Sequence, residues 1–149
     1  MPMITILAVG KKTDGDLINA IESYQKRLRA PFNVKWLSIP YSAKDGVAAR
    51  QDESERLLTH IKPGDYVMLL DERGQQMTSP EFSRALSCRG DTTIIIGGAY
   101  GVNDELRQRA NQMVSLSKMV FPHQLVRLIL IEQIYRAQAI YNHHPYHHE

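Results

Sequence analysis

The sequence predicts an α/β protein with a single domain, built on a parallel β-sheet that is covered by helices. Short β-rich runs alternate with helical patterns from one end of the chain to the other, which is the order of strand–helix–strand units. A chain of 149 residues also suits one domain and is long enough to bury a core of its own. We therefore expect residues 1–149 to form one domain.

The first part of the chain predicts two strands with one helix between them. Residues 3–9 are apolar and indicate a buried strand. Asp14 or Asp16 can cap the helix that follows, and Pro31 is expected to stop it. Residues 34–39 alternate like a half-buried strand. The apolar positions of the helix recur at helical spacing: Leu17, Ile18, Ile21, Tyr24 and Leu28.

The middle of the chain predicts a helix, a strand and a shorter helix. A proline–glycine turn separates the longer helix from a third strand over residues 66–70. The charged residues 71–74 are expected to form a loop. Ser79, which precedes a proline and a glutamate, is expected to be the N-cap of the shorter helix. The apolar positions of the longer helix are Val47, Leu57, Leu58 and Ile61.

The last part of the chain completes the alternation. Residues 92–96 indicate a fourth strand. Asn103 is expected to cap a short polar helix that runs through Ala110. A brief fifth strand over residues 113–116 then leads, through a loop, to a long helix over about residues 124–143.

The composition excludes several classes of protein. The single Cys88 cannot form a disulfide within the chain or a thiolate metal site, which favours a reducing, cytoplasmic setting. No run approaches the roughly 18 apolar residues that a membrane helix needs. Lys11 and Lys12 follow the first apolar run, which is the reverse of the order in a secretion signal. A net charge of +2 permits a nucleic-acid partner without requiring one.

Three loops form the candidate ligand site, because ligands of open parallel sheets bind at the carboxyl ends of the strands. These loops follow Leu70, Ile96 and Leu116. The second contains the sequence GGAYG, whose glycines let the backbone approach a ligand closely, although a tight strand-to-helix turn explains them as well. The motif lacks the lysine of a P-loop and is not a dinucleotide fingerprint.

Two apolar segments near the end of the chain each have two interpretations. In the loop over residues 117–122, Met119, Val120 and Phe121 can sandwich a purine ring, or the loop can pack under its own domain. The final helix is apolar almost all round, which predicts either a homodimer interface or the central helix of a monomer.

Charged and imidazole side chains gather at the C-terminal end. Glu132 and Arg136 stand four residues apart on one helix face, which is also the spacing of an ordinary surface ion pair. Residues 143–148 hold four of the six histidines. A metal-binding tract, a tail that positions a nucleobase and a frayed terminus all remain open interpretations of this segment.

Several motifs together resemble the RlmH family of bacterial pseudouridine methyltransferases, which act on large-subunit ribosomal RNA. The resemblance covers the whole chain in order and in length. It rests on ILAVGK at 6–11, IGGAYG at 96–101, SLSKMVFPH at 115–123, Arg127, EQIYRA at 132–137 and HPYH at 144–147.

The resemblance implies a SPOUT-type fold, an α/β domain whose C-terminal part forms a trefoil knot, and a homodimer. It also implies that S-adenosylmethionine donates a methyl group to N3 of a pseudouridine in stem-loop helix 69 of the 23S ribosomal RNA. The reaction would take place on the assembled ribosome in the cytoplasm. Neither a metal nor a membrane is expected.

The resemblance further implies roles for individual residues. Tyr146 and His147 would position the target base, while Glu132 and Arg136 would orient the tail or the RNA. His148 stands where members of the family commonly have arginine or lysine. The implied cofactor contacts are Leu70, Gly97, Gly98, Leu116, Ser117, Lys118, Met119, Val120 and Phe121.

Basic side chains are the candidate contacts to RNA phosphates: Arg127, Lys118, Arg27 and Arg29. Three other functions remain alternatives. The first is an RNA-binding or ribosome-associated factor of the same fold that transfers no methyl group. The second is a phosphate-handling enzyme that uses the glycine turn, and the third is a metal hydrolase that uses the tail histidines.

Overall fold

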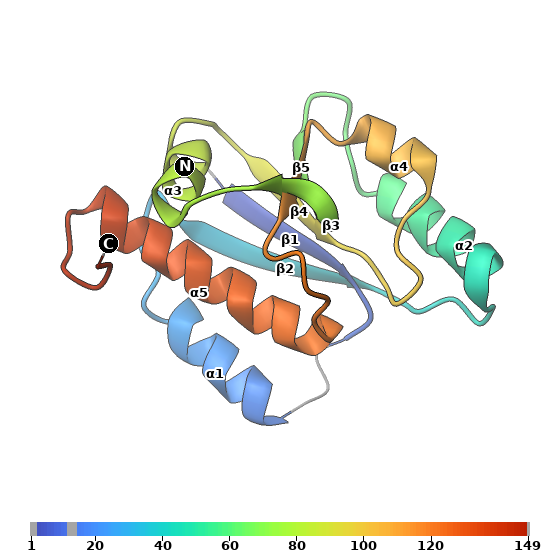
Figure 1. Cartoon of the computed structure of the whole chain (residues 1–149), viewed down its shortest axis with the longest axis horizontal. Coiled ribbons are helices and arrows are strands. Elements are labelled where there is room, and N and C mark those ends of the chain that lie inside the picture. Colours follow the sequence, from blue (N-terminus) through green and yellow to red (C-terminus); the bar gives the residue numbers. More distant parts are fainter. Residues whose placement is uncertain (1–2, 12–14, 149) are drawn as a thin grey trace.

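The computed structural model describes residues 3–11 and 15–148, and it confirms the expected α/β fold (Figure 1). Its sheet has five strands in the order β2-β1-β4-β3-β5, all paired in parallel. The strands are β1 (Met3–Val9), β2 (Asn33–Ile39), β3 (Tyr66–Gln76), β4 (Thr92–Ile96) and β5 (Gln112–Ser115). The helices are α1 (Gly15–Gln25), α2 (Gly46–Leu58), α3 (Ser79–Ser87), α4 (Asp104–Arg109) and α5 (His123–Tyr141).

Helices cover both faces of the sheet. Helices α1, α3 and α5 lie on one face, and α2 and α4 lie on the other (Figure 1). Successive residues of the central strand β4 alternate between two cores, so that Ile94 belongs to the core under α5 and Ile95 to the core under α2. Burial on both faces explains why the central strands are continuous apolar runs rather than alternating ones.

The first helix is shorter than the sequence predicts. It ends at Gln25 instead of continuing to Pro31, because the backbone tightens into a turn in which Leu28 N donates to Gln25 O (3.2 Å). Leu28 is therefore buried from outside the helix. Asp16 lies in the first turn of α1 rather than at its cap, and Asp14 lies outside the described residues.

The sequence predicts the N-cap residue of α3 wrongly and that of α4 correctly. Thr78, and not Ser79, is the N-cap of α3. Glu81 N donates to Thr78 Oγ1 (3.2 Å) and Thr78 N donates to Glu81 Oε1 (2.9 Å), and this reciprocal capping box is possible only three residues before the glutamate. The expected cap of α4 is confirmed, because Asn103 Oδ1 accepts a hydrogen bond from Leu106 N (2.9 Å).

The charged segment after Leu70 is not the simple loop that the sequence predicts. Pairing of β3 with β5 is interrupted after Leu70 and resumes in a shifted register at Gln75, so β3 continues to Gln76. Gly74 lies so close to β5 that a Cβ there would stand 2.7 Å from the carbonyl carbon of Met113. Residues 71–74 therefore form an outward arch whose end is fixed against the edge strand.

The last helix returns from the edge strand β5 and lies between α1 and α3 (Figure 1). It is buried on the side that faces the sheet, through Leu130, Ile131 and Ile134, whereas Leu125, Leu128 and Ile129 are only half-buried. The trefoil knot implied by the resemblance stays a prediction. In the part of the chain that the structure describes, no helix is long and apolar enough to cross a membrane.

Candidate active site

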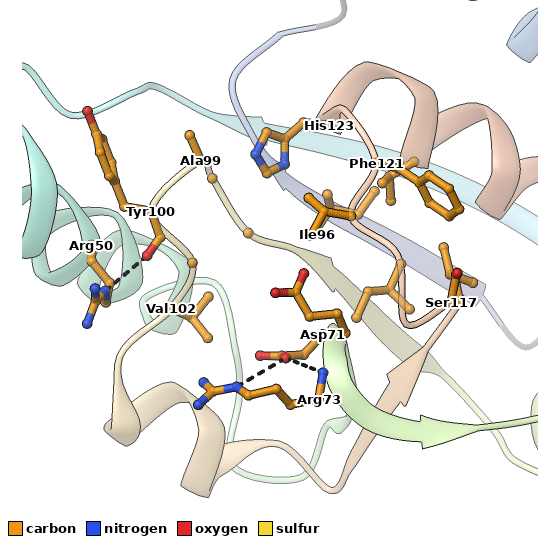
Figure 2. Close-up of a pocket in the computed structure, with 18 of the residues that line it drawn as sticks. Arg50, Asp71, Arg73, Ile96, Ala99, Tyr100, Val102, Ser117, Phe121 and His123 are labelled. Atoms are coloured by element: carbon orange, nitrogen blue, oxygen red, sulfur yellow. Dashed lines mark hydrogen bonds and ion pairs between the residues drawn. The ribbon is translucent and has the colours of Figure 1, made fainter.

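The three segments selected from the sequence meet around one cavity of about 580 Å³, beside the interruption of β3 after Leu70 and at the carboxyl ends of β4 and β5. Figure 2 shows Phe121 and His123 on one side of it, Asp71 opposite them, and Tyr100 at a third side. The volume is typical of sites for small molecules, which occupy roughly 300–1,000 Å³. Its walls include Leu70, Gly97, Gly98, Leu116, Ser117, Met119, Val120 and Phe121.

The glycine sequence after β4 is both a tight turn and a wall of the cavity, so both interpretations of it hold. Gly101 N donates to Gly98 O (3.0 Å), and Gly101 has a φ of 76°, in the left-handed region that favours glycine. A Cβ on Gly98 would lie 2.5 Å from Glu53 Oε1, in the side chain of a residue that is only 3% exposed. Glycine at this position therefore allows a buried carboxylate to sit behind the turn.

The loop after β5 does not pack under its own domain. Met119 and Val120 are 74% and 75% exposed while they line the cavity. The loop is held from within, because Ser115 Oγ donates to Ser117 O (2.8 Å) and Met119 N donates to Ser117 Oγ (3.0 Å). Lys118 is exposed and does not line the cavity. The apolar side chains are thus available to a flat ring, as the first interpretation requires.

Sequence reasoning missed the charged rim of the cavity. Asp71 pairs with Arg107 of α4 and, at 3.6 Å, with Arg73, and all three line the cavity. Arg50 of α2 is also at the rim, where its Nε donates to Tyr100 O (3.0 Å) (Figure 2). The position of Asp71 directly after the strand predicted over residues 66–70 was a usable signal, but no pattern in the sequence brings α2 or α4 to this edge.

His123 lines the cavity beside Phe121, with Arg127 one helical turn behind it. Arg127 is 0% exposed, and its Nη2 donates to Val9 O (3.0 Å) and Gly10 O (2.6 Å). The prediction that Arg127 contacts an RNA phosphate is therefore wrong, because its guanidinium supports the end of β1 inside the protein. Burial, with the charge of Arg127 second, lowers the pKa of His123 below 6.5, against the smaller opposing effect of Glu53.

The four residues proposed for the tail and its helix form one cluster. Arg136 Nε donates to Glu132 Oε1 (2.7 Å), and Arg136 Nη1 lies 3.1 Å from His147 Nδ1. The Arg136 guanidinium carbon also lies 4.9 Å from the centre of the Tyr146 ring. Burial raises the pKa of Tyr146 to about 12, and a hydrogen bond with Tyr24 and the charge of Glu132 add to this increase. Tyr146 therefore keeps its proton near neutral pH.

This cluster is remote from the cavity of the same chain. A helix rises about 1.5 Å per residue, so Arg136 lies roughly 20 Å along α5 from His123. The C-terminus lies at the far end of α5 from the point where the chain leaves β5 (Figure 1). The structure thus separates the two groups of site residues that the resemblance combines.

The remaining basic candidates are on the surface. Arg27 and Arg29 are exposed, as is His148 of the tail. Arg27 stacks on aromatic rings, with its guanidinium carbon 4.4 Å from the centre of the Tyr135 ring. Within the described residues, no three His, Cys, Asp or Glu side chains are grouped so that they could hold a metal ion.

Comparison with known proteins places this fold and cavity in the class of SPOUT methyltransferases, because a family model described as predicted SPOUT methyltransferase matches residues 3–147. Three relatives are all called ribosomal RNA large subunit methyltransferase H. The protein of Parabacteroides distasonis is 40% identical, and the match covers 98% of this chain and 99% of that protein. The proteins of Desulfitobacterium hafniense and Geobacter sulfurreducens are each 42% identical, with 99% and 97% of this chain covered and 99% of each relative. The chain belongs to this family of large-subunit methyltransferases, RlmH, as the sequence motifs predict.

Among solved structures, the SpoU methyltransferase AviRb from Streptomyces viridochromogenes, in complex with AdoMet, is similar to this chain. The match has a TM-score of 0.49 and 13% identity, and it covers 92% of this chain and 58% of that one. Membership of the RlmH family confirms the expected class of enzyme, a methyltransferase whose methyl donor is S-adenosylmethionine.

The residues around the cavity fit this donor. The exposed apolar side chains of Met119 and Val120 suit an adenine ring, and the cavity has room for a molecule of this size. A Cβ on Gly97 would come within 3.0 Å of Val102 Cγ1, so side chains are also kept out of the cavity at this wall. The donor carries no phosphate, which agrees with the lack of a P-loop lysine in the glycine turn.

Proposed function

We propose that this protein methylates N3 of a pseudouridine in helix 69 of the 23S ribosomal RNA, on the assembled ribosome in the cytoplasm. The observation that carries this proposal is the cavity at the three strand ends, in a chain 40–42% identical to large-subunit RNA methyltransferases. The bound donor supplies a methyl group on a positively charged sulfur. When bound, it would pass this methyl group to N3 and be left as a neutral thioether, while the N3 proton would pass to solvent water.

The cavity residues contribute binding and alignment. Leu70 and Phe121 present apolar surface from two different strand ends, and the turn at Gly97 presents backbone. Holding two reactants in line contributes up to about 7–11 kcal/mol in ideal cases. The cofactor-binding role proposed for the loop over residues 116–121 is supported by its place around the cavity; Lys118 would contribute only backbone there.

The tail residues contribute contacts to the base. A guanidinium can only donate hydrogen bonds, so His147 Nδ1 accepts from Arg136, and the ring proton of a neutral imidazole then sits on Nε2. The Tyr146 hydroxyl also keeps its proton. Both side chains therefore have a donor suited to the two carbonyl oxygens that flank N3 of the base. Glu132 holds Arg136, which in turn orients His147.

We propose that the enzyme works as a homodimer in which each tail serves the cavity of the other subunit. The separation of about 20 Å along α5 supports this arrangement, because the tail packs against α5 and is too far from its own cavity. The half-buried apolar residues Leu125, Leu128 and Ile129 support it too, since a second copy would cover them.

Exposed basic residues supply contacts to the phosphates of the RNA. Lys118 and Arg29 remain the candidates of this kind, because both are exposed, whereas the guanidinium of Arg27, although exposed, stacks on the rings of Tyr24 and Tyr135. With a net charge of only +2, much of the specificity must come from the shape of the ribosome around the site.

The function is tested with purified protein, ribosomes from a strain that lacks the enzyme, and S-adenosylmethionine labelled on its methyl group. We expect label in the 23S RNA of whole ribosomes, and mass mapping should place one methyl group on a pseudouridine of helix 69. Binding of the donor without any transfer would support the alternative of an RNA-binding factor. Absence of donor binding would refute the enzyme.

Sharing of a tail between subunits is tested by mixing two inactive variants. One lacks residues 144–149 and keeps its cavity, and the other carries Gly98→Leu and keeps its tail. Mixed dimers should regain activity, because one intact cavity then meets one intact tail. Mixed dimers that stay inactive would contradict the exchange of tails.

A further inference from the structure

The C-terminal tail packs on a group of side chains from α5, α1 and the turn after α1, none of which the proposed function uses. We infer that Tyr24, Arg27 and Tyr135 are positioning residues that hold Tyr146 in place before the RNA binds, an inference that rests on the proposed function. A chain terminus is normally mobile unless other elements hold it. Whatever holds residues 142–148 therefore sets the geometry with which this segment meets the base.

Tyr135 of α5 lies between a ring of the tail and a ring of α1. Its centroid is 4.9 Å from that of Tyr146, in an edge-to-face arrangement at 81°. It is also 5.7 Å from the centroid of Tyr24, at 51°. Both separations lie in the range of favourable aromatic pairs. The Tyr24 side chain hydrogen-bonds that of Tyr146 as well. Tyr146 is therefore held at its ring by α5 and at its hydroxyl by α1.

Arg27 joins the same cluster from the turn after α1. Its guanidinium carbon lies 4.4 Å from the centre of the Tyr135 ring and 4.9 Å from that of Tyr24, which are cation–π distances. Its backbone is fixed to α5, because Gln138 Nε2 donates to Arg27 O (2.9 Å) and Arg29 N donates to Gln138 Oε1 (2.6 Å). Gln138 is buried one turn beyond Tyr135. Arg27 is therefore an anchor for the aromatic rings rather than a free phosphate contact.

The cluster as a whole joins three segments that are distant in sequence: α1, α5 and the tail. Tyrosine loses little conformational freedom when it is fixed, so such a cluster orders a terminus at low entropic cost. A tail that is ordered in advance does not have to be ordered when the RNA binds. Loss of the anchor should therefore lower kcat, because alignment is lost, and should leave the distant cofactor cavity unchanged.

The experiment compares Tyr135→Leu with Tyr135→Phe in the full-length protein. Phenylalanine keeps the ring contacts, so kcat with ribosomes should stay within about threefold of wild type, whereas leucine should lower kcat by about tenfold or more. Affinity for S-adenosylmethionine should be unchanged in both variants. Hydrogen exchange of residues 142–148 should be slow in the wild type and fast with leucine. Equal kcat values for the two variants would overturn the inference.

Two further variants separate positioning from general stability. Tyr66→Leu is the matched control, because Tyr66 also carries a stacked arginine, with the Arg89 guanidinium carbon 3.8 Å from its ring centre, but lies on β3. Its kcat should stay near wild type, and an equal loss there would overturn the inference. Tyr24→Phe removes a single oxygen and should lower kcat by about threefold even if Tyr135→Leu fails to fold. A wild-type kcat in Tyr24→Phe would then count against the inference.

The outcome also distinguishes this inference from the proposed function. If the wild type transfers no methyl group, the proposed function fails, and hydrogen exchange alone decides whether the tail is anchored. Slow exchange of residues 142–148 that becomes fast with Tyr135→Leu would support the anchor in that case. Fast exchange in the wild type would refute it.

Discussion

The cofactor cavity and the tail cluster are constructed in opposite ways. The cavity is formed by segments of neighbouring strands and the loops that follow them. One wall is a glycine turn, and another is the loop after β5, which is held by hydrogen bonds between residues two apart in the sequence. The tail cluster consists of side chains: one ion pair, one imidazole and several stacked rings. The first depends on backbone geometry and the second on residue identity. Changes in the two regions should therefore affect different steps of the reaction.

The largest effect should come from removing the tail. A chain truncated after His143 lacks Tyr146 and His147, so it loses both donors proposed for the base. Methyl transfer to ribosomes should fall by about 100-fold or more, while binding of S-adenosylmethionine, measured by calorimetry, stays intact. Full activity of the truncated protein would remove the distinction between the two regions.

The next effect concerns the cavity alone. In Gly98→Ala the new Cβ meets Glu53 Oε1, and Glu53 cannot move freely because its Oε2 accepts a hydrogen bond from Ser42 N (3.0 Å). We expect a loss of stability of about 1–3 kcal/mol and weaker donor binding, measured by denaturant unfolding and calorimetry. Gly64→Ala is the control, because nothing lies within 4 Å of its Cβ. A Gly98→Ala protein that binds the donor normally would show that the turn tolerates a side chain.

A third comparison separates buried from exposed cations. Arg127→Met removes the donor to Val9 O and Gly10 O, so the free energy of unfolding should fall by about 1–3 kcal/mol. Lys118→Ala should leave stability unchanged and lower the slope of log affinity for ribosomes against log salt by about one. An altered salt dependence in the methionine variant would contradict the burial of Arg127.

The smallest effect is a pH dependence. Because burial lowers the pKa of His123, the unfolded chain takes up this proton at a higher pH than the folded one. The contribution of His123 to stability is therefore complete above about pH 6.5 and decreases as the pH falls below it. His123→Gln should lose less Tm than wild type between about pH 7.5 and pH 5. The exposed His148→Gln should behave like wild type, and a parallel loss in all three proteins would exclude His123 as the cause.

The cavity was largely predictable from the sequence, since parallel strands bring their carboxyl ends to one edge and Leu70, Ile96 and Leu116 mark three such ends. The strand order was not predictable, because the central strands are all apolar on both faces and periodicity does not say which strands are neighbours. Arg127 was misassigned for a related reason. An arginine on an apolar helix is expected to point toward solvent or RNA. Only the fold shows that backbone carbonyl groups lie within its reach.

The sequence predicted which residues form the tail cluster, but it did not predict where the cluster lies relative to the cavity. Family resemblance brought Glu132, Arg136, Tyr146 and His147 together as one group. It could not show that they lie far from the cavity of the same chain, because that separation follows from the length of α5 and the direction in which it leaves β5. Contacts from Tyr24 and Arg27 also have no local signal, since more than 100 residues separate them from Tyr146.

The Arg127 side chain joins positions that are 118 and 117 residues apart in the sequence. During synthesis, the oxygens of Val9 and Gly10 leave the translating ribosome long before the guanidinium that completes their bonding. The first strand pairs with β2 and β4, and its second neighbour and the helix that carries Arg127 both come from the second half of the chain. The hydrogen bonds that fix the end of β1 can therefore form only after this part of α5 has been synthesised.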